Sequence, residues 1–196
     1  MRRRLIAPSF AIAAAATLAG CGINSIPTAE ENAKARWADV QNDYQRRADL
    51  IPNLVSTVKA AGAQEKSILV EVTQARAAAN TVRVSADDLS DPAKMAQFDR
   101  AQSTLGLSLQ RMQEAYPELR SQGNYTTLMS QLEGTENRIV IARRDYNTAV
   151  QDYNTRIRTF PDAVGAKIFY GAKPLVPFTA QEGAEKAPTV NFGNAS

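Results

Sequence analysis

The chain has 196 residues, carries 23 basic against 20 acidic side chains, and contains one cysteine and no histidine. Without histidine there is no Ser-His-Asp or Cys-His nucleophile, no zinc site of the Cys/His type and no Glu-x-x-His di-iron site. Carboxylate pairs, Ser-Lys arrangements and carboxylate-bound cations would each need a specific constellation, and the sequence contains none. We therefore expect no catalytic residue, no metal and no cofactor.

The first 21 residues have the pattern of a secretory signal. Three arginines at 2–4 precede an apolar run over 5–18, and small residues lead to Cys21. The ending Leu-Ala-Gly-Cys at 18–21 resembles the lipobox of bacterial lipoproteins, which implies cleavage before Cys21 and a lipid on its sulfur. A retained transmembrane anchor is the main alternative, but the apolar run is shorter than the ~20 residues that a span needs.

Lipidation at Cys21 predicts a membrane-bound protein of the cell envelope that faces the periplasm or the exterior. Gly22 replaces the aspartate that often keeps Gram-negative lipoproteins in the inner membrane, so the outer membrane is favoured where the cell has one. Without the three signal arginines the chain has 20 basic and 20 acidic side chains. A near-neutral chain without a basic block predicts no nucleic-acid partner.

Apolar residues recur every three or four positions from residue 29 to about 81, which predicts a helical packing seam rather than strands. Thr28 and Glu31 have the spacing of a capping box at its start. Because a proline removes a backbone donor, we expect a kink between Arg47 and Pro52, or a restart of the helix capped by Asp49. Gly62 is a second weak point in this first helix.

Two more long helices come after it. Beyond a polar connection over 83–91, Asp91 and Pro92 are a predicted cap and first helical residue, and this second helix ends at Tyr116-Pro117. The third helix is predicted from Asn124 to Thr159, where Phe160-Pro161 stops it.

The remaining residues complete the predicted organisation. Residues 162–171 are expected to form one short helix, and the proline-containing stretch beyond it a tail that is disordered or loosely docked. The predicted division of the chain is a cleaved signal over 1–20, a lipidated tether over 21–28, a helical bundle over 29–170 and the tail over 171–196.

A seven-residue repeat places Tyr146-Asn147 and Tyr153-Asn154 on one side of the third helix, two turns apart. We predict that both tyrosines belong to the core, with their hydroxyls at the bundle surface. The two asparagines then lie beside the seam, where they can hydrogen-bond a neighbouring helix or the backbone of a partner. An interaction site is the alternative to a purely structural role for these pairs.

Four stretches resemble the LemA family: RRADLIPNLVSTVK (46–59), VTQAR (72–76), AYPELRSQGNYTTLMSQLEGTENRI (115–139) and RRDYNTAVQDYNTRIRTFP (143–161). The resemblance covers roughly residues 37–161. It implies a membrane-anchored, extracytoplasmic helical bundle to which no catalytic activity is assigned. Family members tend to carry a Tyr…His-Glu segment where this chain has AGAQE at 61–65, so no role of that histidine transfers.

Arg47 lies on the apolar seam, which is otherwise interrupted in the first helix only by Glu65. A charge in that place must be paired or the helix must splay. Glu133 and Glu136 are the predicted partners on the third helix. The alternatives are a solvated patch, in which Asp43 pairs with Arg47, and a ligand or partner site. The candidate interaction or structural positions are Arg46, Arg47, Asp49, Pro52, Asn53, Glu133, Glu136, Arg143, Tyr146, Asn147, Tyr153 and Asn154.

The sequence thus predicts an all-α fold, an antiparallel bundle of three to four long helices. The leading hypothesis is a non-enzymatic envelope lipoprotein that scaffolds other envelope proteins. The alternative is a protein that self-assembles on the bilayer and organises or remodels it, and an enzyme using carboxylates or Ser-Lys is the least favoured. The seams are equally compatible with packing within one chain or in a homo-oligomer. Glu133, Glu136 and Asp145 lie on one helix and are not expected to converge on a cation.

Overall fold

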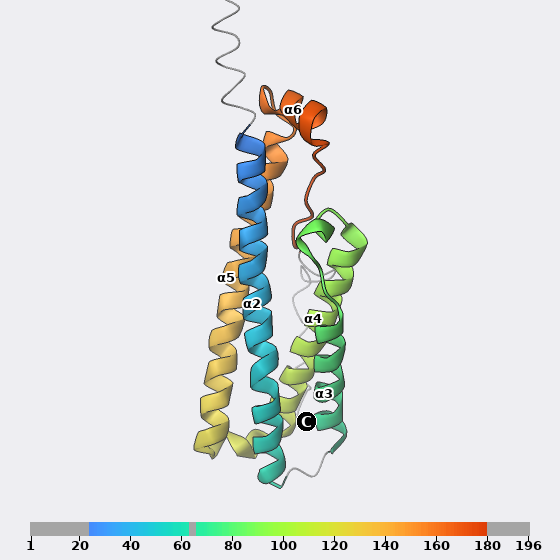
Figure 1. Cartoon of the computed structure of the whole chain (residues 1–196). Coiled ribbons are helices and arrows are strands. Elements are labelled where there is room, and N and C mark those ends of the chain that lie inside the picture. The colour runs from blue at the N-terminus through green and yellow to red at the C-terminus, as the bar shows by residue number, and fades with distance from the viewer. Residues whose placement is uncertain (1–23, 63–65, 180–196) are drawn as a thin grey trace, which may run out of the picture.

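A computed structural model of the chain describes residues 24–62 and 66–179. Its four long helices are α2 (Ser25–Ala60), α3 (Lys66–Thr81), α4 (Pro92–Ala115) and α5 (Gly123–Arg156). Short helical turns η1 (Ala86–Asp88) and η2 (Pro117–Ser121) lie in the connections, and α6 (Asp162–Gly165) and η3 (Ala166–Tyr170) come after α5. The predicted all-α antiparallel bundle is confirmed (Figure 1). The signal, Cys21, Glu65 and residues 180–196 lie outside the described residues.

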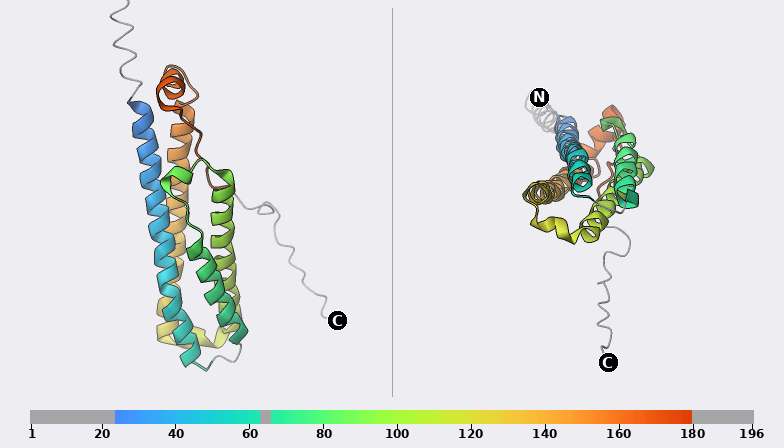
Figure 2. Two further views of the ribbon diagram at one scale, coloured as in Figure 1. Left: turned by 45° about the vertical axis from the view of Figure 1, so that its right-hand side comes forward. Right: turned by 90° about the horizontal axis from the view of Figure 1, so that it is seen from below.

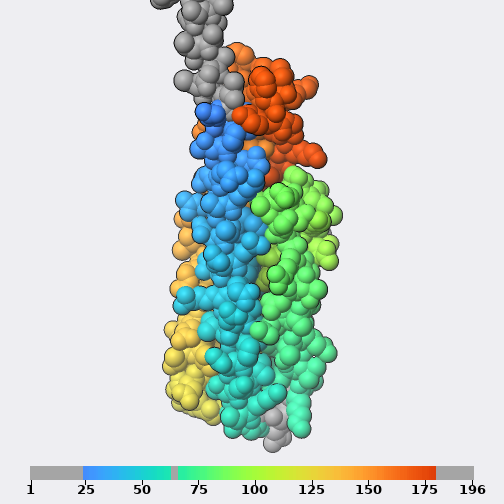
Figure 3. Space-filling model, viewed as in Figure 1, coloured from blue at the N-terminus to red at the C-terminus, as the bar shows by residue number. Residues whose placement is uncertain are grey.

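The helices have unequal lengths. α2 has 36 residues and α5 has 34, so at ~1.5 Å per residue each extends for about 50 Å. α3 has 16 residues and α4 has 24, and both lie toward the end of the bundle where α2 finishes (Figures 1 and 2). At the other end, here called the Ser25 end, α6 and η3 pack beside the first turn of α2 (Figure 3).

Two apolar clusters fill the bundle. The cluster toward the Ser25 end is rich in aromatic rings from α2, α4 and α5, whereas the second cluster contains the buried face of α3. The predicted seam of the first helix is confirmed, because its apolar positions in α2 are buried: Trp37, Val40, Tyr44, Ile51, Leu54 and Val58. Arg47 is buried on the same seam.

The boundaries of the first helix differ from the prediction at both ends. α2 begins at Ser25, and Thr28 does not cap it, because the Thr28 hydroxyl donates a hydrogen bond to the carbonyl of Asn24 inside the first turn. The predicted single helix to about residue 81 is wrong as well. α2 ends at Ala60, and Gly62 has φ 81°, a left-handed conformation that glycine adopts readily. α3 then returns antiparallel to α2 (Figure 1).

The later boundaries agree more closely with the sequence. Asp91 caps α4 as predicted, since its carboxylate accepts hydrogen bonds from the backbone amides of Ala93 and Lys94. α4 ends at Ala115, directly before the predicted Tyr116-Pro117 stop. α5 begins at Gly123 with Gln122 in the cap position, so Asn124 is not its cap, and it ends at Arg156 rather than at Thr159.

Pro52 neither breaks α2 nor lets Asp49 start a new helix, so the expected restart is wrong. A proline at 52 leaves the carbonyl of Ala48, four residues earlier, without its helical donor. Arg76 of α3 supplies that donor, because its Nε lies 2.8 Å from the Ala48 oxygen. The carbonyl that Pro52 leaves free within α2 therefore forms a hydrogen bond that joins α2 to α3.

We predict that Pro52 and Arg76 are energetically coupled. Arg76→Ala removes the side-chain donor to the Ala48 carbonyl and is expected to lower the free energy of unfolding by about 1–2 kcal/mol. In a Pro52→Ala background the new amide at 52 bonds Ala48, so the same Arg76→Ala change is expected to have less than half that effect. Urea unfolding of the four proteins measures the coupling. Arg100→Ala, an exposed change on α4, is the control, and equal effects of Arg76→Ala in both backgrounds would contradict the prediction.

Candidate functional site

A layer of polar side chains crosses the bundle between its two apolar clusters. In α2, Arg47 lies between Tyr44 of one cluster and Ile51 of the other. In α4, Gln102 occupies the same level between Phe98 and Leu105. α5 contributes Glu136 to this level. The layer is extended by a second pair, Asp99 of α4 and Arg143 of α5. These residues together are called the polar layer below.

Arg47 is the centre of the polar layer. Its side chain is 4% exposed, and its Nη1 donates to Glu136 Oε1 at 2.9 Å. Its Nη2 donates to the backbone oxygen and to Oε1 of Gln102, at 3.0 and 2.7 Å. The guanidinium also lies 5.0 Å from the ring centroid of Tyr44. One buried side chain thus connects α2 to both α4 and α5.

Arg143 forms a second junction in the polar layer. Its Nη1 lies 3.0 Å from Asp99 Oδ1 and donates to the Tyr44 hydroxyl at 3.4 Å. Burial raises the pKa of Tyr44, and the charges of Arg143 and Arg47 only partly oppose that effect. Tyr44 therefore keeps its proton at neutral pH. The guanidinium of Arg143 also lies 4.2 Å from the ring centroid of Phe178.

The structure selects one of the predicted partners of Arg47. Glu136 forms the ion pair, whereas Glu133 is exposed on α5 and lines a shallow surface pocket. Asp43 does not pair with Arg47, and its carboxylate lies 3.7 Å from Arg138 instead. A cavity of about 300 Å³ opens beside the layer, lined among others by Arg47, Gln102 and Glu136.

Asn147 and Asn154 hold an extended stretch of the chain that lies beyond η3. The side-chain amide of Asn154 donates to the backbone oxygen of Leu175 at 2.8 Å and accepts from its backbone nitrogen at 2.9 Å. Asn147 makes the same two bonds with Phe178, at 2.9 and 2.8 Å. Each asparagine therefore satisfies one residue of the extended chain as a neighbouring strand would.

The spacing of these bonds is a consequence of helix and strand geometry. The two asparagines are seven positions apart in α5, which is about 10 Å along a helix at ~1.5 Å per residue. Leu175 and Phe178 are three positions apart, which is also about 10 Å in an extended chain at ~3.3 Å per residue. The repeat in α5 thus matches the repeat of the chain that it binds, and the alternative of an asparagine site free for a partner is wrong for the described structure.

Residues 171–179, here called the docked segment, pack against the core through two of their side chains. Leu175 and Phe178 are buried, and the Phe178 ring lies 5.8 Å from Trp37 and 5.6 Å from Tyr146. The bundle boundary expected at 170 therefore does not separate packed from unpacked chain. Tyr146 and Tyr153 are buried as predicted, but the Tyr146 hydroxyl is inside the structure, where it donates to the carbonyl of Val176 at 3.0 Å.

Four of the predicted positions remain on the surface of α2. Arg46, Asp49, Pro52 and Asn53 are all exposed. Asp49 accepts a hydrogen bond from the side chain of Gln45 on the same helix. Packing inside the described bundle thus accounts for Arg47 and, through Ala48, for Pro52, but not for the other three.

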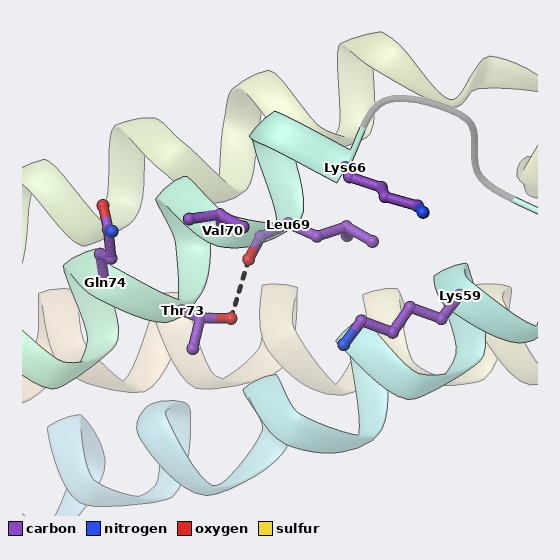
Figure 4. Close-up of a pocket in the computed structure, with 6 residues that line it drawn as sticks. All are labelled: Lys59, Lys66, Leu69, Val70, Thr73 and Gln74. Carbon is purple, nitrogen blue, oxygen red and sulfur yellow. Dashed lines mark hydrogen bonds between the residues drawn. The ribbon is translucent and has the colours of Figure 1, made fainter.

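A groove lies at the end of the bundle opposite the Ser25 end. It has a volume of about 570 Å³ and is lined by Lys59 of α2 and by five residues of α3 (Figure 4). Leu69 and Val70 give it an apolar wall, and the Thr73 hydroxyl is bonded to the Leu69 carbonyl. Among the described residues, its polar lining consists of the amines of Lys59 and Lys66, the Thr73 hydroxyl and the Gln74 carboxamide.

Comparison with known families gives one match. The model of the LemA family matches residues 36–192. The chain belongs to the LemA family. The match continues past residue 161, where the resemblance was expected to end, and includes the docked segment. No curated protein matches the chain significantly.

The family-like stretches of this LemA protein meet one another in the structure. The stretch 46–59 is bonded to the stretch 72–76 through Ala48 and Arg76. The stretch 115–139 supplies Glu136 to Arg47 of the first stretch. The stretch 143–161 holds the docked segment, a contact that the sequence did not predict. The seven-residue Tyr-Asn repeat is the signal that could have indicated it, because its period fits an extended partner.

Within residues 24–62 and 66–179, the structure contains neither a membrane-spanning helix nor a cluster of metal-binding side chains. None of the helices in these ranges is both long and apolar enough to cross a membrane. No three or more acidic, cysteine or histidine side chains in these ranges are grouped closely enough to hold a metal ion.

We predict that Arg47 is required for stability. Arg47→Met removes three hydrogen bonds and leaves the Gln102 side chain without its donor, so the free energy of unfolding is expected to fall by about 1–3 kcal/mol. Arg46→Met, on the neighbouring exposed position, is the control and should change it by less than about 0.5 kcal/mol. Unchanged or higher stability of Arg47→Met in thermal unfolding would rule out a required ion pair.

We also predict that Asn154→Ala releases the docked segment. The change leaves both backbone groups of Leu175 unbonded, which is expected to lower local stability by about 1–3 kcal/mol. Amide hydrogen exchange at Leu175 and Phe178 should accelerate at least tenfold. Trp37, the only tryptophan, should shift its emission to longer wavelength as Phe178 leaves it. Asn53→Ala is the matched control, and unaltered exchange in Asn154→Ala would contradict the role given to Asn154.

Proposed function

We propose that this LemA-family protein is a non-enzymatic lipoprotein of the cell envelope that presents a rigid helical bundle to other envelope proteins. Membership of the family is consistent with a non-enzymatic helical envelope protein. Anchoring through a lipid on Cys21 is supported by the Leu-Ala-Gly-Cys sequence that ends the signal-like segment.

The observation that carries the scaffold proposal is a polar stripe on α2. Arg46, Asp49 and Asn53 are exposed and succeed one another at intervals of three and four residues, so they lie along one side of the helix. They belong to the family-like stretch 46–59, yet their side chains contact no other helix through an ion pair or hydrogen bond within the described residues. A surface of this kind suits recognition of a partner through charge and hydrogen bonds.

The interior of the bundle supports a fixed rather than a mobile surface. Directly beneath the stripe, Arg47 binds groups on α4 and α5, and Ala48 is bonded to α3. Four helices are therefore held to one another at the level where the stripe lies. A surface that does not rearrange loses little conformational entropy when a partner binds.

The scaffold proposal is tested by photo-cross-linking in cells. A photoreactive benzophenone amino acid placed at Arg46, Asp49 or Asn53 is expected to capture one envelope protein reproducibly. Gln97, exposed on α4, provides the control position and should give at least fivefold less of the same product. Equal capture from Gln97, or capture only of further copies of this chain, would contradict the proposal and favour self-assembly on the membrane.

The anchor is tested separately. Cells fed an alkyne-bearing fatty acid should incorporate it into the protein, and Cys21→Ala should abolish incorporation and leave the protein unprocessed. Density-gradient separation of the membranes then places the lipidated protein in the inner or the outer membrane. Absence of the fatty acid from the wild-type protein would overturn the lipoprotein proposal without affecting the docking surface.

A further inference from the structure

Large apolar side chains gather on the surface at the Ser25 end of the bundle. Phe160, Val164, Ile168, Phe169 and Tyr170 are 86%, 49%, 68%, 66% and 43% exposed. They are five of the nine large apolar residues that are exposed in the described structure, yet they occupy only eleven consecutive positions. These five residues are called the apolar cap below. Figure 3 shows the segment that carries them at one extremity of the molecule.

The segment that carries the apolar cap buries small residues and exposes large apolar ones, the reverse of the usual arrangement in a helix that packs on a core. The buried residues of α6 and η3 are Gly165 and Ala166, whereas their large apolar side chains face outward. A helical segment that packs on a core in water normally buries its large apolar residues and exposes small or polar ones. A contiguous apolar surface of this kind marks contact with a membrane or with another apolar surface.

The position of the apolar cap relative to Cys21 decides between these occupants. The Ser25 hydroxyl donates to Asp162 Oδ2 at 2.6 Å, which holds the start of α2 against α6. Only residues 22–24 separate Ser25 from Cys21 in the sequence. At most ~3.5 Å per residue, Ser25 lies within about 14 Å of a lipidated Cys21. The apolar cap is therefore brought to the surface of the bilayer that receives the lipid.

The charges around the apolar cap also suit a bilayer surface. Arg158, Lys167 and Lys173 are exposed on the same stretch of chain. No ion pair joins any of the three to an acidic residue within the described residues. Asp162, the acidic residue of this stretch, accepts the hydrogen bond from Ser25. Cations that flank apolar and aromatic side chains favour anionic headgroups over a neutral protein surface.

We propose that the apolar cap inserts into the boundary between headgroups and acyl chains of the membrane in which Cys21 is anchored. This proposal rests on the lipid anchor of the proposed function. The lipid and the apolar cap are two attachments on one extremity of the bundle, so together they restrict its tilt. The long axis of α2 and α5 then points away from the membrane, and the exposed stripe on α2 is held at a fixed height above it.

The test uses the lipidated full-length protein with one added cysteine in the apolar cap, Phe160→Cys or Ile168→Cys. Lipidation converts the Cys21 sulfur to a thioether, so the added cysteine is the only free thiol. It is labelled with the fluorophore NBD, and the protein is reconstituted at low density in vesicles of phosphatidylethanolamine and phosphatidylglycerol at 3:1. Val140→Cys and Leu107→Cys, at exposed apolar positions outside the cap, are the matched controls.

The expected result is an NBD emission at least 10 nm bluer in the cap than in the controls. Lipids carrying a shallow doxyl group should quench the cap label at least threefold more strongly than the control labels. Emission and quenching equal to the controls would overturn the proposal. A blue shift without doxyl quenching, or one that vanishes as the protein is diluted into more lipid, would also overturn it, in favour of a second copy of the chain.

Failure of the anchor gives a different signature. If Cys21 carries no lipid, the mass spectrum shows two NBD groups per chain and the protein does not float with the vesicles. That outcome removes the premise of the proposed function, whereas control-like fluorescence of a floating, singly labelled protein rejects only the insertion of the apolar cap. Circular dichroism melting within about 2 °C of the wild type verifies that the cysteine variants are folded.

Discussion

The arrangement of this protein depends on a mismatch of lengths. α2 and α5 pair along their whole extent, but α3 has less than half as many residues as α2 and leaves one end of the pair uncovered. α3 contributes only to the second apolar cluster, and the docked segment contributes only to the first. The docked segment is thus the fourth wall of the bundle near the Ser25 end, where Phe178 covers Trp37 and Tyr146.

Covering a helical face with extended chain raises the problem of unsatisfied backbone groups. A strand normally obtains its hydrogen bonds from another strand, and the helices beside it have none to give. Asn147 and Asn154 provide these bonds because a carboxamide presents an N–H donor and a carbonyl acceptor on one edge, as a residue of a neighbouring strand does. Val176, one of the two residues between Leu175 and Phe178, donates to the Leu89 carbonyl and accepts from the Tyr146 hydroxyl.

Features that depend on local rules could be predicted from the sequence. The three-and-four periodicity identified the buried faces, Asp91-Pro92 and Tyr116-Pro117 marked both ends of α4, and the buried charge of Arg47 demanded a partner that Glu136 supplies. Features that depend on contacts between distant segments could not be predicted. The proline rule is correct for an isolated helix, but Arg76, 28 positions from Ala48 in the chain, removes the penalty by bonding the free carbonyl.

The candidate sites divide in the same way. Those residues of the family-like stretches that are buried could be identified as core residues from the apolar seam, because burial is periodic in a helix. The docked segment could not, because its prolines and glycine resemble those of an unstructured tail until the spacing of its partners on α5 is known. Surface positions such as Arg46 and Asn53 look in the sequence like any other polar positions on the outer face of a helix. The structure shows that their side chains make no ion pair or hydrogen bond to another helix within residues 24–62 and 66–179.

The polar layer contains charged and hydrogen-bonding side chains of the kinds found in binding sites, but these side chains bind one another. A guanidinium has hydrogen-bond donors and no acceptor, so Arg47 and Arg143 can only donate to the groups around them. Tyr44 is held in its protonated form by burial, and the two carboxylates each face an arginine. Glu136 and Asp99 therefore pair with charges that the fold itself supplies, Arg47 in the interior and the partly buried Arg143. Such a layer opposes sliding of α2, α4 and α5 along one another. A shift of one of these helices by one turn would separate Arg47 from Gln102 or from Glu136. The stripe on α2 lies over this level, so the proposed docking surface is placed where Arg47 bonds α2 to both α4 and α5.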